Sequence, residues 1–139
     1  MLFVAGGMRT APLAERVYTK YDAQLGWVSI PGISVKNIYG EGMSIKINSQ
    51  GFRNDNDLPV EVPEGKIRVI LSGDSFTFGY DVDDHQTWGH LLAGMDDRIE
   101  TINMGQGGYG LDQAYLWYMR DGKKFKSQIH IVALNPYVL

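Results

Sequence analysis

The chain has 139 residues, of which 44% are hydrophobic and 12% aromatic, enough for one globular domain with a core of its own. Thirteen basic and sixteen acidic residues give a net charge of -3, and no basic block favours binding to nucleic acid or to an anionic membrane surface. The chain has no cysteine, which excludes a disulfide framework, a thiolate metal site and a cysteine nucleophile.

The first 65 residues predict a lead that precedes an α/β unit. Residues 1–7 are apolar, but this stretch is far shorter than the roughly 20 residues of a membrane span. It also lacks the basic region of a secretory signal, so no localisation is predicted. Pro12 is suited to begin a short helix, in which Leu13, Val17 and Tyr21 recur at helical spacing.

The segment 26–52 has a different pattern, alternation punctuated by glycines. Apolar residues alternate with polar ones on both sides of the stretch 39–42, Tyr-Gly-Glu-Gly, which predicts two short half-buried strands joined as a hairpin. Prolines, acids and amides then break regular structure over 53–63. We expect a solvated linker there rather than a calcium-binding loop, because the glycine and glutamate of such a loop are missing at the required spacing.

Residues 66–139 predict helices alternating with buried parallel strands. Ile67 to Leu71 form an apolar run without polar alternation, typical of a strand buried on both faces. We expect a helix over 87–95, a strand over 99–103, a helix over 111–125 and a buried strand over 129–134. The order is βαβαβ, and the whole chain is expected to be a single domain. The expected core face of the second helix consists of Leu111, Tyr115, Tyr118 and Met119.

Ser75 lies in the turn after the first of these strands, where open α/β sheets bind ligands. It is interpreted either as a nucleophile or as a structural turn residue. A flavodoxin-like phosphate or nucleotide loop is the further alternative, and Asp74 disfavours it because its charge opposes a bound dianion. Three acids and a histidine, Asp81, Asp83, Asp84 and His85, precede the helix expected from Thr87, and we interpret this set as residues at a helix start rather than as a metal cluster.

A glycine-rich loop follows the second strand. Gly105, Gly107 and Gly110 have the spacing of a dinucleotide fingerprint. No Asp or Glu follows in 130–135 to bind the ribose, so we expect the glycines to admit a small oxyanion instead.

Sequence blocks in both halves carry a resemblance. The block 73–79, Gly-Asp-Ser-Phe-Thr-Phe-Gly, follows a hydrophobic strand, and the block 103–110 reads Asn-Met-Gly-Gln-Gly-Gly-Tyr-Gly. They resemble the first and second blocks of the SGNH (GDSL-type) serine hydrolases. Upstream, Gly26-Trp27, Pro31-Gly32 and the stretch 48–53 resemble the lead-in of one bacterial branch of that family. The resemblance covers about 21–134.

The resemblance implies a three-layer α/β/α, flavodoxin-like sheet of the SGNH hydrolase type. Residues 66–139 would form the first half of this α/β domain, and residues 1–65 would form an N-terminal lead that contains a short β-hairpin. It implies a serine ester hydrolase or O-acyl (acetyl) transferase that forms an acyl-serine on Ser75. The backbone N–H groups of Ser75 and Gly108, with Asn135, would stabilise the oxyanion. A strand-end turn before Pro136 is the alternative role for Asn135. The substrate would be a small ester or an acylated carbohydrate or lipid, and neither metal nor organic cofactor is implied.

A serine nucleophile also needs a base. The family takes it from an Asp-x-x-His block, and none of His85, His90 and His130 has an aspartate at that spacing. We therefore expect a truncated and inactive hydrolase, with a non-catalytic α/β fragment or binding module as the alternative. The apolar last strand would leave an unpaired sheet edge, which predicts self-association.

Overall fold

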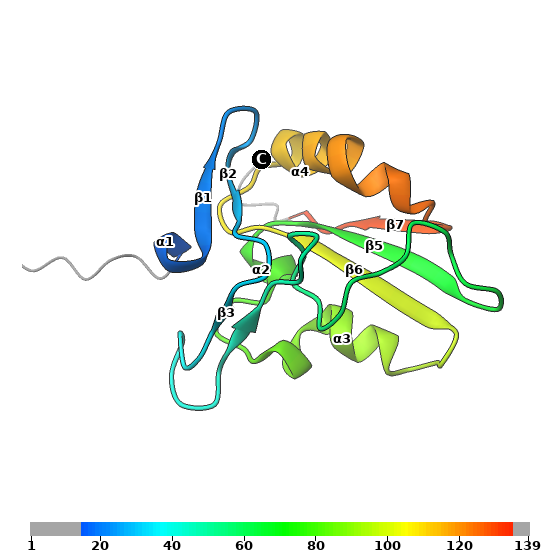
Figure 1. Cartoon of the computed structure of the whole chain (residues 1–139), viewed down its shortest axis with the longest axis horizontal. Helices are drawn as coiled ribbons and strands as arrows, with labels where there is room; N and C mark the ends of the chain where they lie inside the picture. The colour runs from blue at the N-terminus through cyan, green and yellow to red at the C-terminus, as the bar shows by residue number, and fades with distance from the viewer. Residues whose placement is uncertain (1–14, 135–139) are drawn as a thin grey trace, which may run out of the picture.

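The computed structural model describes residues 15–134 (Figure 1). It begins with the short helix α1 (Glu15–Tyr18), followed by an antiparallel pair, β1 (Thr19–Asp22) and β2 (Gly26–Ser29). The predicted helix reaching Tyr21 was therefore wrong beyond residue 18, and the Tyr21 side chain is 82% exposed. The reason lies in the turn. The Asp22 carboxylate accepts hydrogen bonds from the backbone N–H groups of Gln24 and Leu25 and closes a hairpin in place of a helix.

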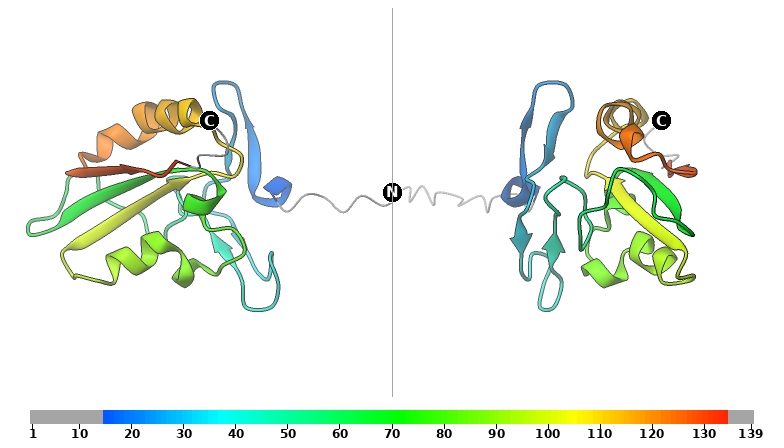
Figure 2. Two further views of the ribbon diagram at one scale, coloured as in Figure 1. Left: turned by 180° about the vertical axis from the view of Figure 1, so that it is seen from behind. Right: turned by 45° about the vertical axis from the view of Figure 1, so that its right-hand side comes forward.

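A second, smaller hairpin follows. Strand β3 (Ser34–Val35) pairs antiparallel with β4 (Ile45–Lys46), as the alternating pattern predicted, although both strands are shorter than expected. Both hairpins lie beside the carboxyl ends of the strands of the main sheet (Figures 1 and 2).

The main sheet has three parallel strands in the order β6-β5-β7: β5 (Ile67–Gly73), β6 (Ile99–Gly105) and β7 (Ile129–Val132). Helix α3 lies on one face of the sheet and α4 on the other (Figure 1). The predicted α/β class is confirmed. Strand β5 is central and buried, whereas β7 lies at an edge with its apolar side chains exposed, so the expectation of a buried third strand was wrong.

The helices begin where capping residues allow. After β5 come α2 (Ser75–Phe78) and the 3₁₀ turn η1 (Asp84–Gln86). Thr87 then caps α3 (Trp88–Ala93), close to the predicted bounds, by accepting the N–H of His90. No helix of the described part, 15–134, is long and apolar enough to cross a membrane.

Helix α4 (Leu111–Trp117) continues through the π-helical turn η2 (Tyr118–Gly122) and the 3₁₀ turn η3 (Lys123–Phe125). The predicted core face was wrong for this helix except at Tyr118, which is partly buried against the larger core cluster. Leu111, Tyr115 and Met119 are 47%, 56% and 40% exposed, whereas Ala114 and Trp117 are buried. Apolar residues occur on more than one face of α4, and the alanine–tryptophan pair is the one that faces the sheet core.

Two hydrophobic clusters join the N-terminal segment to the α/β unit. In the larger cluster, Leu25 and Phe52 pack with residues of β5, β6 and the α4 region: Ile70, Ile102, Met104, Tyr109, Trp117 and Phe125. In the smaller cluster, Tyr18, Ile45 and Ile47 pack with Phe78 of α2. The 53–63 segment is therefore no linker between independent parts, since residues on both sides of it share the same cores.

Candidate active site

Ser75 is the first residue of α2 and follows the carboxyl end of the central strand β5. Asp74 caps this helix: its carboxylate accepts the N–H of Phe76 at 2.9 Å, and its carbonyl accepts the N–H of Phe78 at 2.9 Å. Ser75 is half-buried. The turn thus holds a serine hydroxyl at the end of the sheet where α/β proteins bind ligands.

Two glycines at strand ends let this turn pack closely. A Cβ on Gly105 would lie 2.1 Å from the backbone nitrogen of Phe78, so any larger residue would push α2 away from β6. A Cβ on Gly73 would lie 2.3 Å from Oγ1 of Thr77 and 2.9 Å from the carbonyl oxygen of Ala133. The ends of all three strands are therefore in close contact around the serine turn.

Gly108 lies in the loop after β6 and has a left-handed backbone, with a φ of 76°. The first hairpin holds this loop. Trp27 Nε1 donates a hydrogen bond to the carbonyl of Gly107 at 2.9 Å, and the Tyr109 hydroxyl donates to the carbonyl of Trp27. Burial raises the pKa of Tyr109, and the nearby Asp22 carboxylate adds to this effect, so the hydroxyl stays a neutral donor.

Gln106 connects the glycine loop to the serine strand. Its backbone N–H donates to the carbonyl of Gly73 at 3.1 Å, and its side-chain Oε1 accepts the hydroxyl of Ser29 at 2.9 Å. Both side chains are buried. Within residues 15–134, the backbone N–H groups of Ser75 and Gly108 donate to no protein acceptor. Neither amide is therefore committed to an acceptor in this part of the chain.

Two hollows lie near the serine turn, one lined by Ser75 and the other by Asp74. An open depression of about 490 Å³ is lined by Ser75 itself and by side chains of the segment after it, among them Phe76, Tyr80 and Trp88. A much smaller cavity of about 20 Å³ lies between the ends of β5 and β7, bounded by Asp74 and Gly110. The larger depression has room for a small organic substrate.

No histidine of the described part hydrogen-bonds to Ser75. Nε2 of His130 instead makes a 2.8 Å hydrogen bond with Oγ of Ser72, and its ring stacks on Tyr118 at 3.9 Å. Burial lowers the pKa of His130. The rings of His85 and His90 lie next to each other, and His90 lines a depression that does not include Ser75. Asn135, the third predicted site residue, lies outside the described residues.

Three supporting residues were not predicted from the sequence: Ser29, Trp27 and Gln106. Trp27 could have been singled out, because the pair Gly26-Trp27 is part of the resemblance. Its hydrogen bond to the glycine loop, however, joins residues 80 positions apart, which the sequence does not predict. The buried pair of Ser29 and Gln106 spans 77 residues and has no local signature.

The fold and this geometry define an α/β protein with a serine at the carboxyl end of its central parallel strand. The chain matches no model of a known protein family, and a search of curated proteins gives no significant match.

Proposed function

We propose that the chain carries the nucleophile portion of a serine ester hydrolase or O-acyl transferase site of the SGNH type. Ser75 is the nucleophile, and the N–H groups of Ser75 and Gly108 are the oxyanion donors, with Asn135 as a further donor. The observation that carries the proposal is a half-buried serine at the end of the central strand, whose backbone N–H, like that of Gly108, has no protein acceptor among residues 15–134.

The strand order supports the same assignment. The order β6-β5-β7 corresponds to the first three strands of a flavodoxin-like sheet, whose ligands bind between the ends of its first and third strands. The small cavity between β5 and β7 lies at this point, next to Asp74.

In the proposed reaction, Oγ of Ser75 attacks the carbonyl carbon of an ester while a base takes the hydroxyl proton. The carbonyl oxygen becomes an oxyanion, and the two amides donate to it. Collapse of this intermediate expels the alcohol, which takes up the proton, and leaves an acyl-serine. Water or a sugar hydroxyl then attacks the acyl group and regenerates the serine. A small ester, or an acylated carbohydrate or lipid, is the proposed substrate.

The base is the missing part, since no histidine of 15–134 bonds to Ser75. In a serine hydrolase without its base, the oxyanion hole and binding retain about 1,000- to 10,000-fold acceleration over water. We expect the chain to remain near that level with a chromogenic ester. Added imidazole should partly replace the base.

The test is covalent labelling with a fluorophosphonate, with and without imidazole, read by peptide mass spectrometry. We expect an adduct on Ser75 that increases with imidazole and is absent from Ser75→Ala. Ser72→Ala is the matched control, because Ser72 bonds to a histidine but is buried, and it should label like the wild type. Failure of Ser75 to label even with imidazole would favour the alternative, a non-catalytic α/β binding module.

A further inference from the structure

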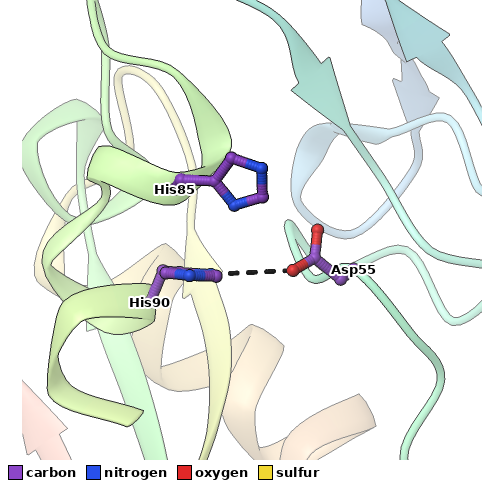
Figure 3. Close-up of side chains that lie close together, drawn as sticks. All are labelled: Asp55, His85 and His90. Atoms are coloured by element: carbon purple, nitrogen blue, oxygen red, sulfur yellow. Dashed lines mark ion pairs between the residues drawn. The ribbon is translucent and has the colours of Figure 1, made fainter. Parts of the chain in front are cut away.

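Asp55, His85 and His90 converge on the surface from three separate parts of the chain (Figure 3). Asp55 belongs to the segment before β5, His85 to η1 and His90 to α3. One potential ligand atom from each residue lies within 4.8 Å of those of the other two. Nδ1 of His90 lies 3.6 Å from Oδ2 of Asp55.

The distances suit a small divalent ion. Zinc binds histidine nitrogen and carboxylate oxygen at about 2.0–2.1 Å, which places tetrahedral ligands about 3.3 Å from one another. The pair of His90 and Asp55 is close to that separation. Their side chains are 43% and 41% exposed, so small rotations can bring the cluster onto an ion without disturbing the core. The spacing of His85 and His90, with four residues between them, also falls in the range of histidine pairs that bind zinc.

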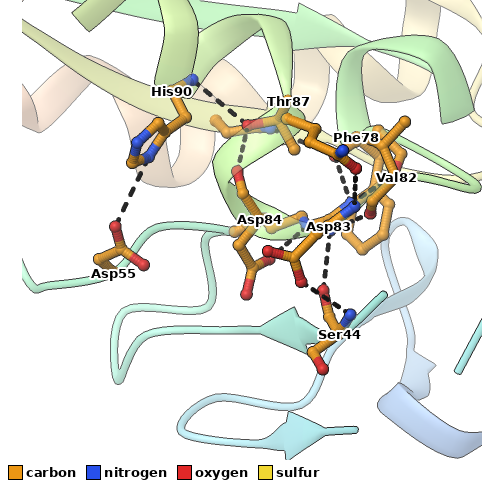
Figure 4. A network of polar contacts seen from close by, with 12 residues as sticks. Ser44, Asp55, Phe78, Val82, Asp83, Asp84, Thr87 and His90 are labelled. Atoms are coloured by element: carbon orange, nitrogen blue, oxygen red, sulfur yellow. Dashed lines mark hydrogen bonds and ion pairs between the residues drawn. The ribbon is translucent and has the colours of Figure 1, made fainter. Parts of the chain in front are cut away.

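The backbone between the two histidines is held by Thr87 (Figure 4). Its hydroxyl donates to the carbonyl of Asp84 at 3.0 Å and accepts the N–H of His90 at 3.3 Å. The turn from η1 into α3 therefore fixes the backbone positions from which both histidine side chains extend.

The Asp55 segment is tied to the same framework. The Arg53 guanidinium donates to the Asp84 carboxylate at 2.8 Å, which joins this segment to the turn that carries the histidines. The Asn54 side chain donates to the carbonyl of Thr101 at 2.7 Å and accepts the N–H of Asn103 at 2.9 Å, which attaches the segment to β6. Residues on both sides of the cluster thus hold the backbone segments that carry all three ligands.

The neighbouring acids have other partners. The Asp84 carboxylate is paired with Arg53, and Asp83 accepts the backbone N–H of Ser44 at 2.9 Å. This leaves two imidazoles and one carboxylate, a donor set that suits zinc and other divalent transition metals. A cavity of about 400 Å³, lined by Asp55 and His90 among others, leaves room for water in the remaining coordination positions.

We propose that Asp55, His85 and His90 bind one divalent transition-metal ion, for which Zn²⁺ is the probe. The cluster does not include Ser75, so this site can exist whether or not the chain is a hydrolase. Sequence spacing alone did not reveal it, because Asp55 lies 30 residues before His85.

The experiment is calorimetric titration of the chelator-treated full chain, free of any histidine tag, with Zn²⁺. We expect one ion to bind per chain. His85→Gln, His90→Gln and Asp55→Asn should each weaken binding by about tenfold or more, since loss of even an outer-shell partner of a metal typically costs 10- to 100-fold. His130→Gln is the matched control, because it removes the remaining histidine of the chain and should bind like the wild type.

Co²⁺ gives a second readout, since a low-coordinate site with nitrogen and oxygen ligands produces strong visible absorption that an aqueous ion lacks. That absorption should be reduced in the three ligand variants and kept in His130→Gln. Circular dichroism checks that each variant is folded, and the exposure of the ligands makes loss of the fold unexpected. Absence of stoichiometric Zn²⁺ binding, or undiminished affinity in a folded His90→Gln, would overturn the proposal.

Discussion

Arg53 connects more of this molecule than any local pattern around it suggests. Its side chain is 1% exposed and pairs with the Asp84 carboxylate. The same guanidinium donates to four backbone carbonyls, those of Ser44, Phe78, Gly79 and Val82. It also lies over the ring of Phe78, with 5.0 Å between Cζ and the ring centre. From the sequence, Arg53 appeared only as the last residue of a lead-in motif and the start of a solvated turn.

Replacing Arg53 with methionine should therefore destabilise the fold strongly. Methionine fills a similar volume but leaves the Asp84 carboxylate and several carbonyls without their donor. Removing one partner of a buried ion pair typically costs about 3–5 kcal/mol. Urea unfolding followed by circular dichroism would measure the change. Arg98→Met is the control, because Arg98 also pairs with an aspartate, Asp96, but on the surface, and its loss should change stability little.

The left-handed backbone of Gly108 sets the position of the amide that is proposed to bind the oxyanion. At its φ of 76° an alanine would be strained, and its Cβ would lie 3.2 Å from the Trp27 ring. Gly108→Ala should shift the amide that is proposed to bind the oxyanion. Loss of one such donor typically lowers turnover about 100- to 1,000-fold. We expect a decrease of this order in imidazole-supported acylation of Ser75. Gly94→Ala, at an ordinary helical φ outside the site, should acylate normally, and equal rates for both variants would exclude Gly108 as a donor.

At the scale of elements, the sequence pattern correctly predicted the strands and helices whose formation depends on neighbouring residues. Strand β5 and helix α3 were predicted because an apolar run, and acids that precede a helix start, are local signals. The hairpin of β1 and β2 was missed, because its turn depends on the Asp22 side chain while the flanking residues also fit a helix. The buried face of α4 was also wrong, since only packing against the sheet selects among several apolar faces.

His130 links β7 to its neighbours and predicts a pH dependence of stability. Burial lowers its pKa in the folded chain from the ordinary value of 6.5. Between the lowered value and 6.5 the unfolded chain therefore binds more protons than the folded chain. Stability should fall as the pH decreases through about 6.5 and should level off below the folded pKa.

Urea unfolding at a series of pH values from neutral to mildly acidic would measure this effect. The glutamine of the His130→Gln variant does not titrate in this pH range, and its amide can still hydrogen-bond to Ser72. The stability of this variant should therefore fall less over the same range. The other histidines, His85 and His90, are present in both proteins and cancel in the comparison. Identical pH profiles for the two proteins would show that His130 does not contribute.

At the scale of the whole molecule, long-range contacts determine how the site is assembled. The first hairpin contacts the glycine loop through Trp27, and Asn54 attaches the preceding segment to β6. The sequence predicts the parallel strands in the order observed, and a single domain. It does not predict which residues of 15–65 enter the cores, because contacts of this separation leave no periodic signal.

The edge of the sheet at β7 carries a final prediction, about association. Within residues 15–134, β7 pairs only with β5, and its apolar side chains Ile129, Ile131 and Val132 are 46%, 37% and 41% exposed. An exposed apolar strand edge favours pairing with another copy of the chain. We expect dimers or larger species at tens of micromolar in sedimentation velocity.

Ile131→Lys should shift this population toward monomer, because a lysine on an edge strand opposes strand pairing. Val60→Lys is the matched control: Val60 is 46% exposed but lies in the segment before β5, outside any strand, so this variant adds the same charge without altering the edge. If both lysine variants dissociate the protein equally, the effect is one of net charge and the edge is not the interface. A wild-type chain that sediments as a monomer at these concentrations would contradict the prediction directly.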